Sequence, residues 1–186
     1  MKHEGIDLEK RAAYAVADLM MLAAKTAPKG RGADNVVAIV LDGKEKDDLS
    51  AEMHRIAKES GSEVFERDAG NVENSHLVIV IGAKDNPVGI SCGFCGFKNC
   101  GDLKKAGGRC AFNITDLGVA LGSAVSVAAN HRIDNRIMFT IGKAVQNLKF
   151  FPDNVKTCFG IPLSSSAKSI FFDRGIAPVP INLDKK

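Results

Sequence analysis

The sequence has few aromatic residues and no strong excess of charge of either sign. Aromatic side chains make up 6% of the 186 residues, with no Trp and one Tyr, so a core must be built mainly from aliphatic side chains and Phe. The formal net charge is +3, and the sequence has no dense basic patch interleaved with aromatics of the kind that binds nucleic acid. The composition therefore predicts a protein with no nucleic-acid partner.

Long hydrophobic runs are also missing. No segment approaches the roughly 20 uninterrupted apolar residues that a membrane span requires, and the charged N-terminal stretch lacks the apolar core of a signal peptide. We therefore expect a cytoplasmic protein that does not associate with a membrane. Thiols stay reduced in that compartment, so clustered cysteines there indicate metal binding or catalysis before disulfides.

Common nucleotide-binding and hydrolase motifs do not occur. The chain has no G-x-x-x-x-G-K-[ST], G-x-G-x-x-G or G-x-S-x-G sequence. Its four histidines form neither H-E-x-x-H nor another metal-ligand spacing. No general acid, base or nucleophile stands out, so the sequence names no catalytic residue and leaves open whether the protein is an enzyme.

Apolar patterning predicts one α/β or α+β domain over residues 1–186, with helices flanking a central sheet. Continuous apolar runs at residues 36–41 and 76–81 predict strands buried on both faces. Helical spacing and turn residues give the remaining elements: helices over residues 8–27, 47–60, about 116–130 and 136–148, and strands at 63–66 and 158–163.

The predicted helix that begins near Asp116, with Thr115 as a candidate cap, is rich in small residues. Two of them are Gly118 and Gly122, and a glycine inside a helix costs on the order of 1 kcal/mol. We therefore expect this helix to need close approach by a neighbouring helix or by a bound group.

Four of the five cysteines lie within 19 consecutive positions, in the spacing C-x2-C-x4-C-x9-C. They fall in a segment at residues 86–112 that holds a third of the chain's glycines, and they are Cys92, Cys95, Cys100 and Cys110. One glycine-rich loop can supply several thiolates and point its amide N–H groups at the sulfurs, which favours an iron–sulfur cluster. Nearby basic residues either offset the cluster's negative charge or are solvated surface side chains: Lys98, Lys104, Lys105 and Arg109.

Other interpretations of the cysteines stay open. A structural zinc site also takes four thiolates, but such sites usually present two tight pairs, and only Cys92 and Cys95 form one. A redox C-x-x-C normally opens a helix, whereas this pair lies among glycines. A four-iron cluster suits one compact loop, and a two-iron cluster is the alternative. Cys158, in an apolar context, is typical of a small buried hydrophobe, and it is the substitute ligand should Cys110 lie too far away.

The stretch from Cys92 through Cys100 resembles the cluster-binding module of a family of uncharacterised ferredoxin-domain proteins. The resemblance covers most of the chain, including the ending from Phe159 to Arg174. The C-x2-C-x4-C start is also similar to the four-iron motif of the large corrinoid iron–sulfur subunit in acetyl-CoA synthesis. In that subunit the final cysteine comes later than Cys110 does here.

A second resemblance is to flavin-dependent nitroreductases. The order of features is similar: an N-terminal helix, the Ala-Pro-Lys-Gly turn at residues 27–30, a buried strand, the helix led by Asp116 and the Gly-Ile-Pro at 160–162. It implies a nitroreductase-like sheet flanked by helices, with the cysteine-rich loop inserted before the small-residue helix, and a homodimer. The family's early Arg-x-Ser-x-Arg flavin-phosphate motif is missing, since residues 10–14 read KRAAY. If FMN binds, the candidate phosphate contacts are Lys29, Arg31 and Lys168.

The sequence leaves three functional hypotheses. The first is a redox or electron-transfer protein that carries the cluster and exchanges electrons with a partner protein or a small molecule. The second is an oxidoreductase in which the cluster serves a flavin or a substrate in a pocket lined by the small-residue helix. The third is a non-redox protein in which a four-thiolate zinc site holds a loop together.

Overall fold

The structure, a computed structural model, describes residues 4–172 of the chain. Helices and strands follow one another in the order α1 (Gly5–Thr26), the short 3-10 helix η1 (Gly30–Gly32), β1 (Val36–Leu41), α2 (Gly43–Ser60), α3 (Glu63–Glu73), β2 (Leu77–Lys84), α4 (Cys100–Lys105), α5 (Ala111–Asn130), β3 (Asp134–Asn135), α6 (Phe139–Leu148) and β4 (Val155–Ser164).

The four strands form one antiparallel sheet in the order β1-β2-β4-β3. β2 is central, and its first seven residues are buried, which confirms the strand predicted on both faces at 76–81. The strand predicted at residues 36–41 is present as β1, but it is an edge strand whose four middle residues are only half-buried, so the expected burial on both faces was wrong. A continuous apolar run cannot distinguish a central strand from an edge strand whose outer side lacks a partner in the chain.

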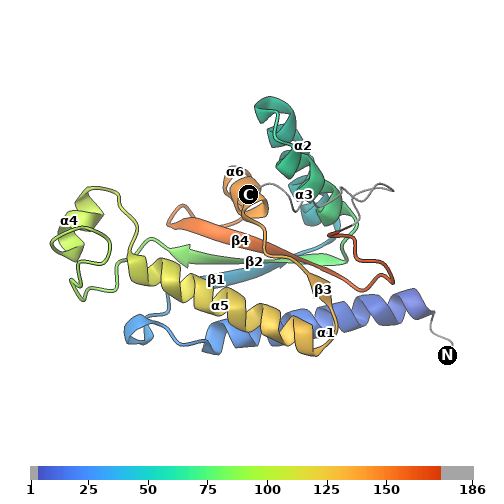
Figure 1. Cartoon of the computed structure of the whole chain (residues 1–186), viewed down its shortest axis with the longest axis horizontal. Coiled ribbons are helices and arrows are strands. Elements are labelled where there is room, and N and C mark those ends of the chain that lie inside the picture. The colour runs from blue at the N-terminus through green and yellow to red at the C-terminus, as the bar shows by residue number, and fades with distance from the viewer. Residues whose placement is uncertain (1–3, 173–186) are drawn as a thin grey trace, which may run out of the picture.

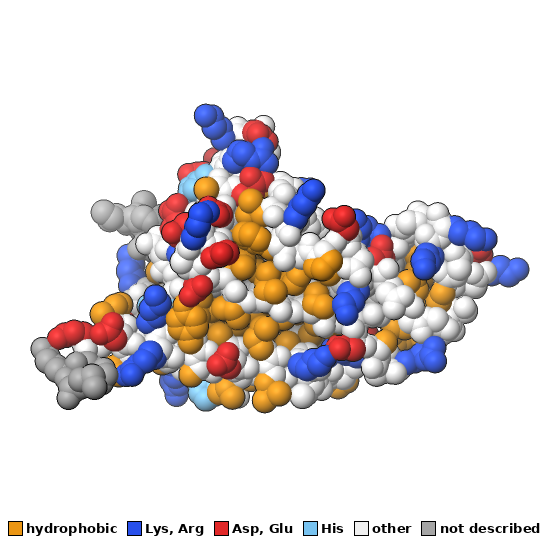
Figure 2. All heavy atoms as spheres, turned by 180° about the vertical axis from the view of Figure 1, so that it is seen from behind, with side chains coloured by type: hydrophobic (Ala, Val, Ile, Leu, Met, Phe, Trp, Pro, Cys, Tyr) orange, Lys and Arg blue, Asp and Glu red, His pale blue; other side chains and the backbone are white. Residues whose placement is uncertain are grey.

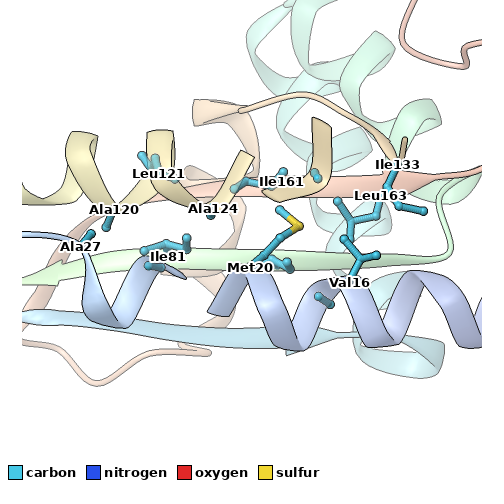
Figure 3. Packing of buried hydrophobic residues seen from close by; sticks show 14 of the residues in the cluster. Val16, Met20, Ala27, Ile81, Ala120, Leu121, Ala124, Ile133, Ile161 and Leu163 are labelled. Carbon is cyan, nitrogen blue, oxygen red and sulfur yellow. The ribbon is translucent and has the colours of Figure 1, made fainter. Parts of the chain in front are cut away.

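Two helical layers cover the two faces of the sheet (Figure 1). α1 and α5 lie on one face, and α2, α3 and α6 lie on the other. Alternate residues of β2 serve the two cores: Ile79 and Ile81 pack toward α1 and α5, while Val78 and Val80 pack toward the other layer. In Figure 3, Met20 of α1 lies in the first core, among side chains of α5, β2 and β4.

Residues 63–66, predicted as a short strand, begin helix α3 instead. The apolar residues Phe65, Ala69 and Val72 recur at helical spacing and pack into the second core. Two glutamates in the first turn also suit a helix N-terminus, where the backbone dipole favours negative charge. The predicted segment of four residues was too short to distinguish the helical period of 3.6 residues from the strand period of two.

The small-residue helix α5 begins at Ala111, five residues before the predicted start at Asp116. Among the described residues it is the single helix with the length and hydropathy of a membrane span, a mean of 1.4 over the relevant window, of which 39% is buried. That is weak support for a span, because α5 packs on α1 and β2 and its inward side belongs to the first core.

The glycines of α5 do not allow a close contact within the described chain. A methyl group at Gly118 or Gly122 would have no atom within 4 Å, so the predicted close approach is not made there by another element of the chain. The close approach is found in α6 instead. There a Cβ at Gly142 would lie 1.8 Å from the carbonyl oxygen of Cys158 on β4.

Candidate metal centre

Residues 86–110 form a lobe that projects beyond one end of the sheet, and we call it the cysteine lobe (Figure 1). It leaves the sheet after β2 and returns at the start of α5, with α4 as its one helix. All four cysteines predicted to bind a metal therefore lie in this lobe or, for Cys110, at its junction with α5.

Buried asparagines fasten the start of the lobe to the sheet. Asn113 of α5 donates to the carbonyl oxygens of Lys84 (3.1 Å) and Asn86 (2.9 Å). Asn35, just before β1, donates to the same carbonyl of Asn86 (2.9 Å) and to the side-chain oxygen of Asn113 (3.2 Å). Both asparagines are buried, and their hydrogen bonds fix the path of the chain out of β2.

The loop at η1 supplies a second attachment. The backbone N–H of Gly30 donates to both carboxylate oxygens of the buried Asp116, at 3.0 and 3.1 Å. From the same loop, the Arg31 guanidinium reaches across to the carbonyl oxygen of Val88 in the lobe (3.0 Å). The lobe is thereby tied to α5 and to the loop before β1 as well as to β2.

Glycines with positive φ allow the lobe to curl tightly. Gly93 and Gly96 have φ values of 77° and 83°, and a backbone bond from Gly96 N to Gly93 O (2.9 Å) closes a turn over Cys95. Leu103 of α4 is fully buried and packs with Val88 and Cys110. Phe112 of α5 and Ala33 before β1 pack against the same residues, so this small apolar core joins the lobe to the rest of the fold.

The four lobe thiols differ in their surroundings. Cys95 and the buried Cys110 share the small apolar core. Cys92 is exposed, and the half-buried Cys100 accepts the N–H of Ser91 at its Sγ (3.4 Å). No group of three or more His, Cys, Asp or Glu side chains in residues 4–172 is arranged to hold a metal ion. The four thiols therefore share one lobe but do not surround a common point.

Local electrostatics favour the thiolate form of Cys100. The N–H of Ser91 lowers the pKa of this thiol, with smaller contributions from the Ser91 hydroxyl and the amides of Gly89 and Ile90. Cys110 occupies the N-cap position of the 20-residue helix α5, where the helix dipole is positive. Both features suit an anionic sulfur-bound group.

Cys158 lies outside the lobe. It is buried in the second core on β4, and its thiol donates to the carbonyl oxygen of Gly142 at 3.3 Å. Burial raises the pKa of this thiol to about 11, so it stays protonated. This environment fits the small buried hydrophobe that its sequence context indicates.

The three candidate flavin-phosphate residues do not converge within the described chain. Lys29 donates to three carbonyl oxygens at the end of α1, at 2.8 to 2.9 Å, and burial lowers its pKa. Arg31 holds the Val88 carbonyl. Lys168 and Lys29 lie toward opposite ends of the central strand β2. Lys168 follows the end of β4, which pairs with the start of β2, and Lys29 precedes the start of β1, which pairs with the end of β2. These two ends of β2 are roughly 20 Å apart.

Sequence reasoning missed the polar attachments of the lobe, which involve Asn35, Asn113 and Asp116. It also missed an open hollow of about 400 Å³ between α1 and β1, lined by Met21 and the start of β1 and bordered by a Lys25–Asp34 ion pair. No motif marks either feature. The one available signal was that two polar residues of α5, Asn113 and Asp116, lie on its inward, otherwise apolar face.

Comparison with solved structures defines the class of the fold. A nitroreductase with bound FMN from Desulfitobacterium hafniense DCB-2 matches with a TM-score of 0.58 and 17% identity, over 83% of this chain and 78% of that chain. NfrA2 from B. megaterium matches with a TM-score of 0.55 and 16% identity over 83% of this chain, which spans only 58% of NfrA2. The protein therefore has a nitroreductase-like fold, as predicted, and at these identities the likeness extends to the fold alone.

A relative that covers nearly the whole chain gives the family. An uncharacterized protein from Archaeoglobus fulgidus is 41% identical over 182 residues, which are 93% of this chain and 94% of that protein. The family model described as "Uncharacterized protein containing a ferredoxin domain (DUF2148)" matches residues 106–174, of which 173 and 174 lie outside the described residues. The chain belongs to this family of ferredoxin-domain proteins. The matched region includes Cys110 and Cys158 but none of the first three lobe cysteines, so it does not test the ligand set.

Proposed function

We propose that the protein binds an iron–sulfur cluster in the cysteine lobe and acts in electron transfer or another redox process. The proposed ligands are Cys92, Cys95, Cys100 and Cys110. The observation that carries the proposal is the lobe itself, in which four thiols are collected and a backbone N–H is already directed at one of the sulfurs. The family's description as containing a ferredoxin domain supports it.

The residues present fit such a group in chemistry. Thiolates are the usual ligands of iron–sulfur clusters, and amide N–H groups near the sulfurs tune the potential. Cys110 would supply the most buried of the four sulfurs and Cys92 the most exposed. When bound, the cluster supplies one-electron exchange without a proton or a bond change. Binding would require the four thiols to move together.

The test is iron, acid-labile sulfide and zinc content of the anaerobically purified full chain, together with its absorption spectrum. About four iron and four sulfide ions per chain support the four-iron form, and about two of each support the two-iron form. About one zinc ion per chain without sulfide or visible absorption contradicts the proposal and favours a structural zinc site.

Two matched variants test the ligand set. Cys95→Ser is expected to abolish the visible spectrum while circular dichroism shows most of the fold intact, because Cys95 packs in the small core at the lobe and not in either main core of the sheet. Cys158→Ser is expected to keep the iron, since this thiol lies in the second core, outside the lobe. Retained stoichiometric iron in Cys95→Ser, or loss of iron only in Cys158→Ser, contradicts the assignment.

A flavin-linked oxidoreductase is the second candidate, favoured by the nitroreductase-like fold and the hollow between α1 and β1. Against it, Lys29, Arg31 and Lys168 do not form one phosphate site within a single chain. A homodimer belongs to the same proposal, since a second copy is what could bring distant segments together. Gentle purification followed by reconstitution with FMN tests it: no bound flavin and a monomeric mass in solution count against it.

A further inference from the structure

The surface of the cysteine lobe presents an exposed aromatic ring. Phe94 lies between Cys92 and Cys95 in sequence and is 77% exposed, the highest value among the large hydrophobic side chains that the structure describes. Its ring stacks on Phe112 of α5, with centroids 6.0 Å apart and planes only 6° from parallel. The Phe94 ring is therefore exposed to solvent but fixed in orientation by the stacking, which is typical of an aromatic anchor at a protein interface.

The same lobe carries three basic side chains without acidic partners. Lys98, Lys104 and Lys105 are exposed, and none forms an ion pair with another described residue. Of the acidic groups nearest in sequence, Asp85 pairs with Arg109, and Asp102 accepts from the neutral amide of Asn99 and keeps its charge, so the lobe retains an excess of positive charge. Figure 2 shows Lys and Arg side chains as the dominant charged groups on the projecting end of the molecule.

We propose that the lobe surface, with Phe94, Lys98, Lys104 and Lys105, is the docking surface for a protein electron carrier with acidic residues around its own redox centre. The proposal rests on the proposed function, because the redox centre would lie in the same lobe. One electron passes between the two proteins, so that one is oxidised as the other is reduced, with no bond made or broken.

An exposed aromatic ring and an excess of basic side chains on one lobe argue for such a partner. Electron-transfer complexes are small and transient, and charge complementarity at their rim speeds the encounter more than it tightens the complex. A second copy of this chain is disfavoured as the occupant, since it would bring its own basic lobe against this one. A buried role in neutralising a cluster does not account for the three lysines, because all three are exposed.

The test measures binding, independently of activity. A purified acidic plant-type ferredoxin is titrated into the metal-loaded protein by isothermal calorimetry at low and at near-physiological ionic strength. Lys98→Gln/Lys104→Gln/Lys105→Gln is compared with Lys10→Gln/Lys58→Gln/Lys143→Gln, which removes the same charge from exposed sites on α1, α2 and α6. Phe94→Ala is compared with Val64→Ala, which shortens an exposed apolar side chain on α3.

The lobe triple variant is expected to bind about tenfold more weakly at low salt, and its distant counterpart to match the parent within about twofold. Phe94→Ala is expected to weaken binding about tenfold at both salt concentrations, because an aromatic anchor is little affected by screening.

Equal weakening by the two triple variants, or binding to single-stranded DNA but not to ferredoxin, overturns the docking proposal. If the chain holds iron and sulfide and is reduced by dithionite yet binds ferredoxin no better than a basic cytochrome c, the docking surface is wrong while the cluster proposal stands. If no cluster can be loaded, both fail together.

Discussion

Replacing Gly142 with alanine would place a methyl group where α6 lies against the backbone of β4. The new Cβ would be 1.8 Å from the carbonyl oxygen of Cys158, and reaching the 3.4 Å of ordinary contact requires a displacement of about 1.6 Å. The opposing atom is backbone in a strand paired with β2, so it cannot move aside as a side chain would. We expect a loss of about 3 kcal/mol in the free energy of unfolding, near the upper end for overpacking.

The matched control is Gly118→Ala in α5, where a Cβ meets no atom within 4 Å. Alanine is the better helix former, so this variant is expected to gain roughly 0.5–1 kcal/mol. For a chain of this length the two changes correspond to a fall of about 6–12 °C and a rise of about 1–4 °C in Tm, measured by differential scanning calorimetry. A Tm for Gly142→Ala within about 1 °C of the parent would refute the reasoning. A destabilised Gly118→Ala would indicate that α5 is covered by a second copy.

Three further outcomes are expected. Asn113→Ala should cost about 1–3 kcal/mol in urea unfolding, since the Lys84 carbonyl loses this donor and the Asn86 carbonyl keeps only Asn35. It should also speed amide exchange in the cysteine lobe more than in β2; uniform acceleration would contradict the anchoring role. The pKa of His54 is raised, first by its bond to Glu66. The stabilisation from the charged imidazole is therefore complete below the unfolded pKa of about 6.5 and is lost as pH rises through the folded pKa. The difference in unfolding free energy between wild type and His54→Gln should shrink by less than about 1 kcal/mol from pH 6 to pH 9, and a difference that grows with pH would contradict this sign. In metal-free protein, iodoacetamide should label the exposed Cys92 readily and Cys158, whose pKa is about 11, only after unfolding; mass spectrometry showing early labelling of Cys158 would contradict its burial.

The apolar pattern of the sequence predicted a helix or strand correctly wherever the helical or strand period continued over enough residues to be distinguished from the other. The apolar runs at 36–41 and 76–81 and the helical spacing over residues 8–27 correspond to β1, β2 and α1. Residues 63–66 failed because four residues fit either period, and the helical face emerges only when Ala69 and Val72 are included. The edge position of β1 depends on which strands pair, which is a property of the tertiary fold.

The candidate site divides in the same way. Cysteine spacing located the lobe because metal ligands are a matter of residue type and short sequence distance. The attachments of the lobe were not predictable, since Asn35, Asn113 and Asp116 come from separate parts of the chain and meet only when the sheet and α5 are assembled. Likewise, the stacking of Phe94 on Phe112 joins two residues that no sequence period relates.

The use of the basic residues near η1 bears on where redox chemistry would take place. Lys29 satisfies three carbonyl oxygens at the end of α1, which otherwise have no intrahelical donor. Moving its ammonium group to a flavin phosphate would leave those carbonyls unpaired, and moving Arg31 would release the Val88 carbonyl and loosen the lobe. A thiolate-bound group in the lobe would bind without moving Lys29 or Arg31. The contacts that hold the lobe therefore compete with a flavin-phosphate site at Lys29 and Arg31, and they favour the lobe over these two residues as the place for the proposed redox centre.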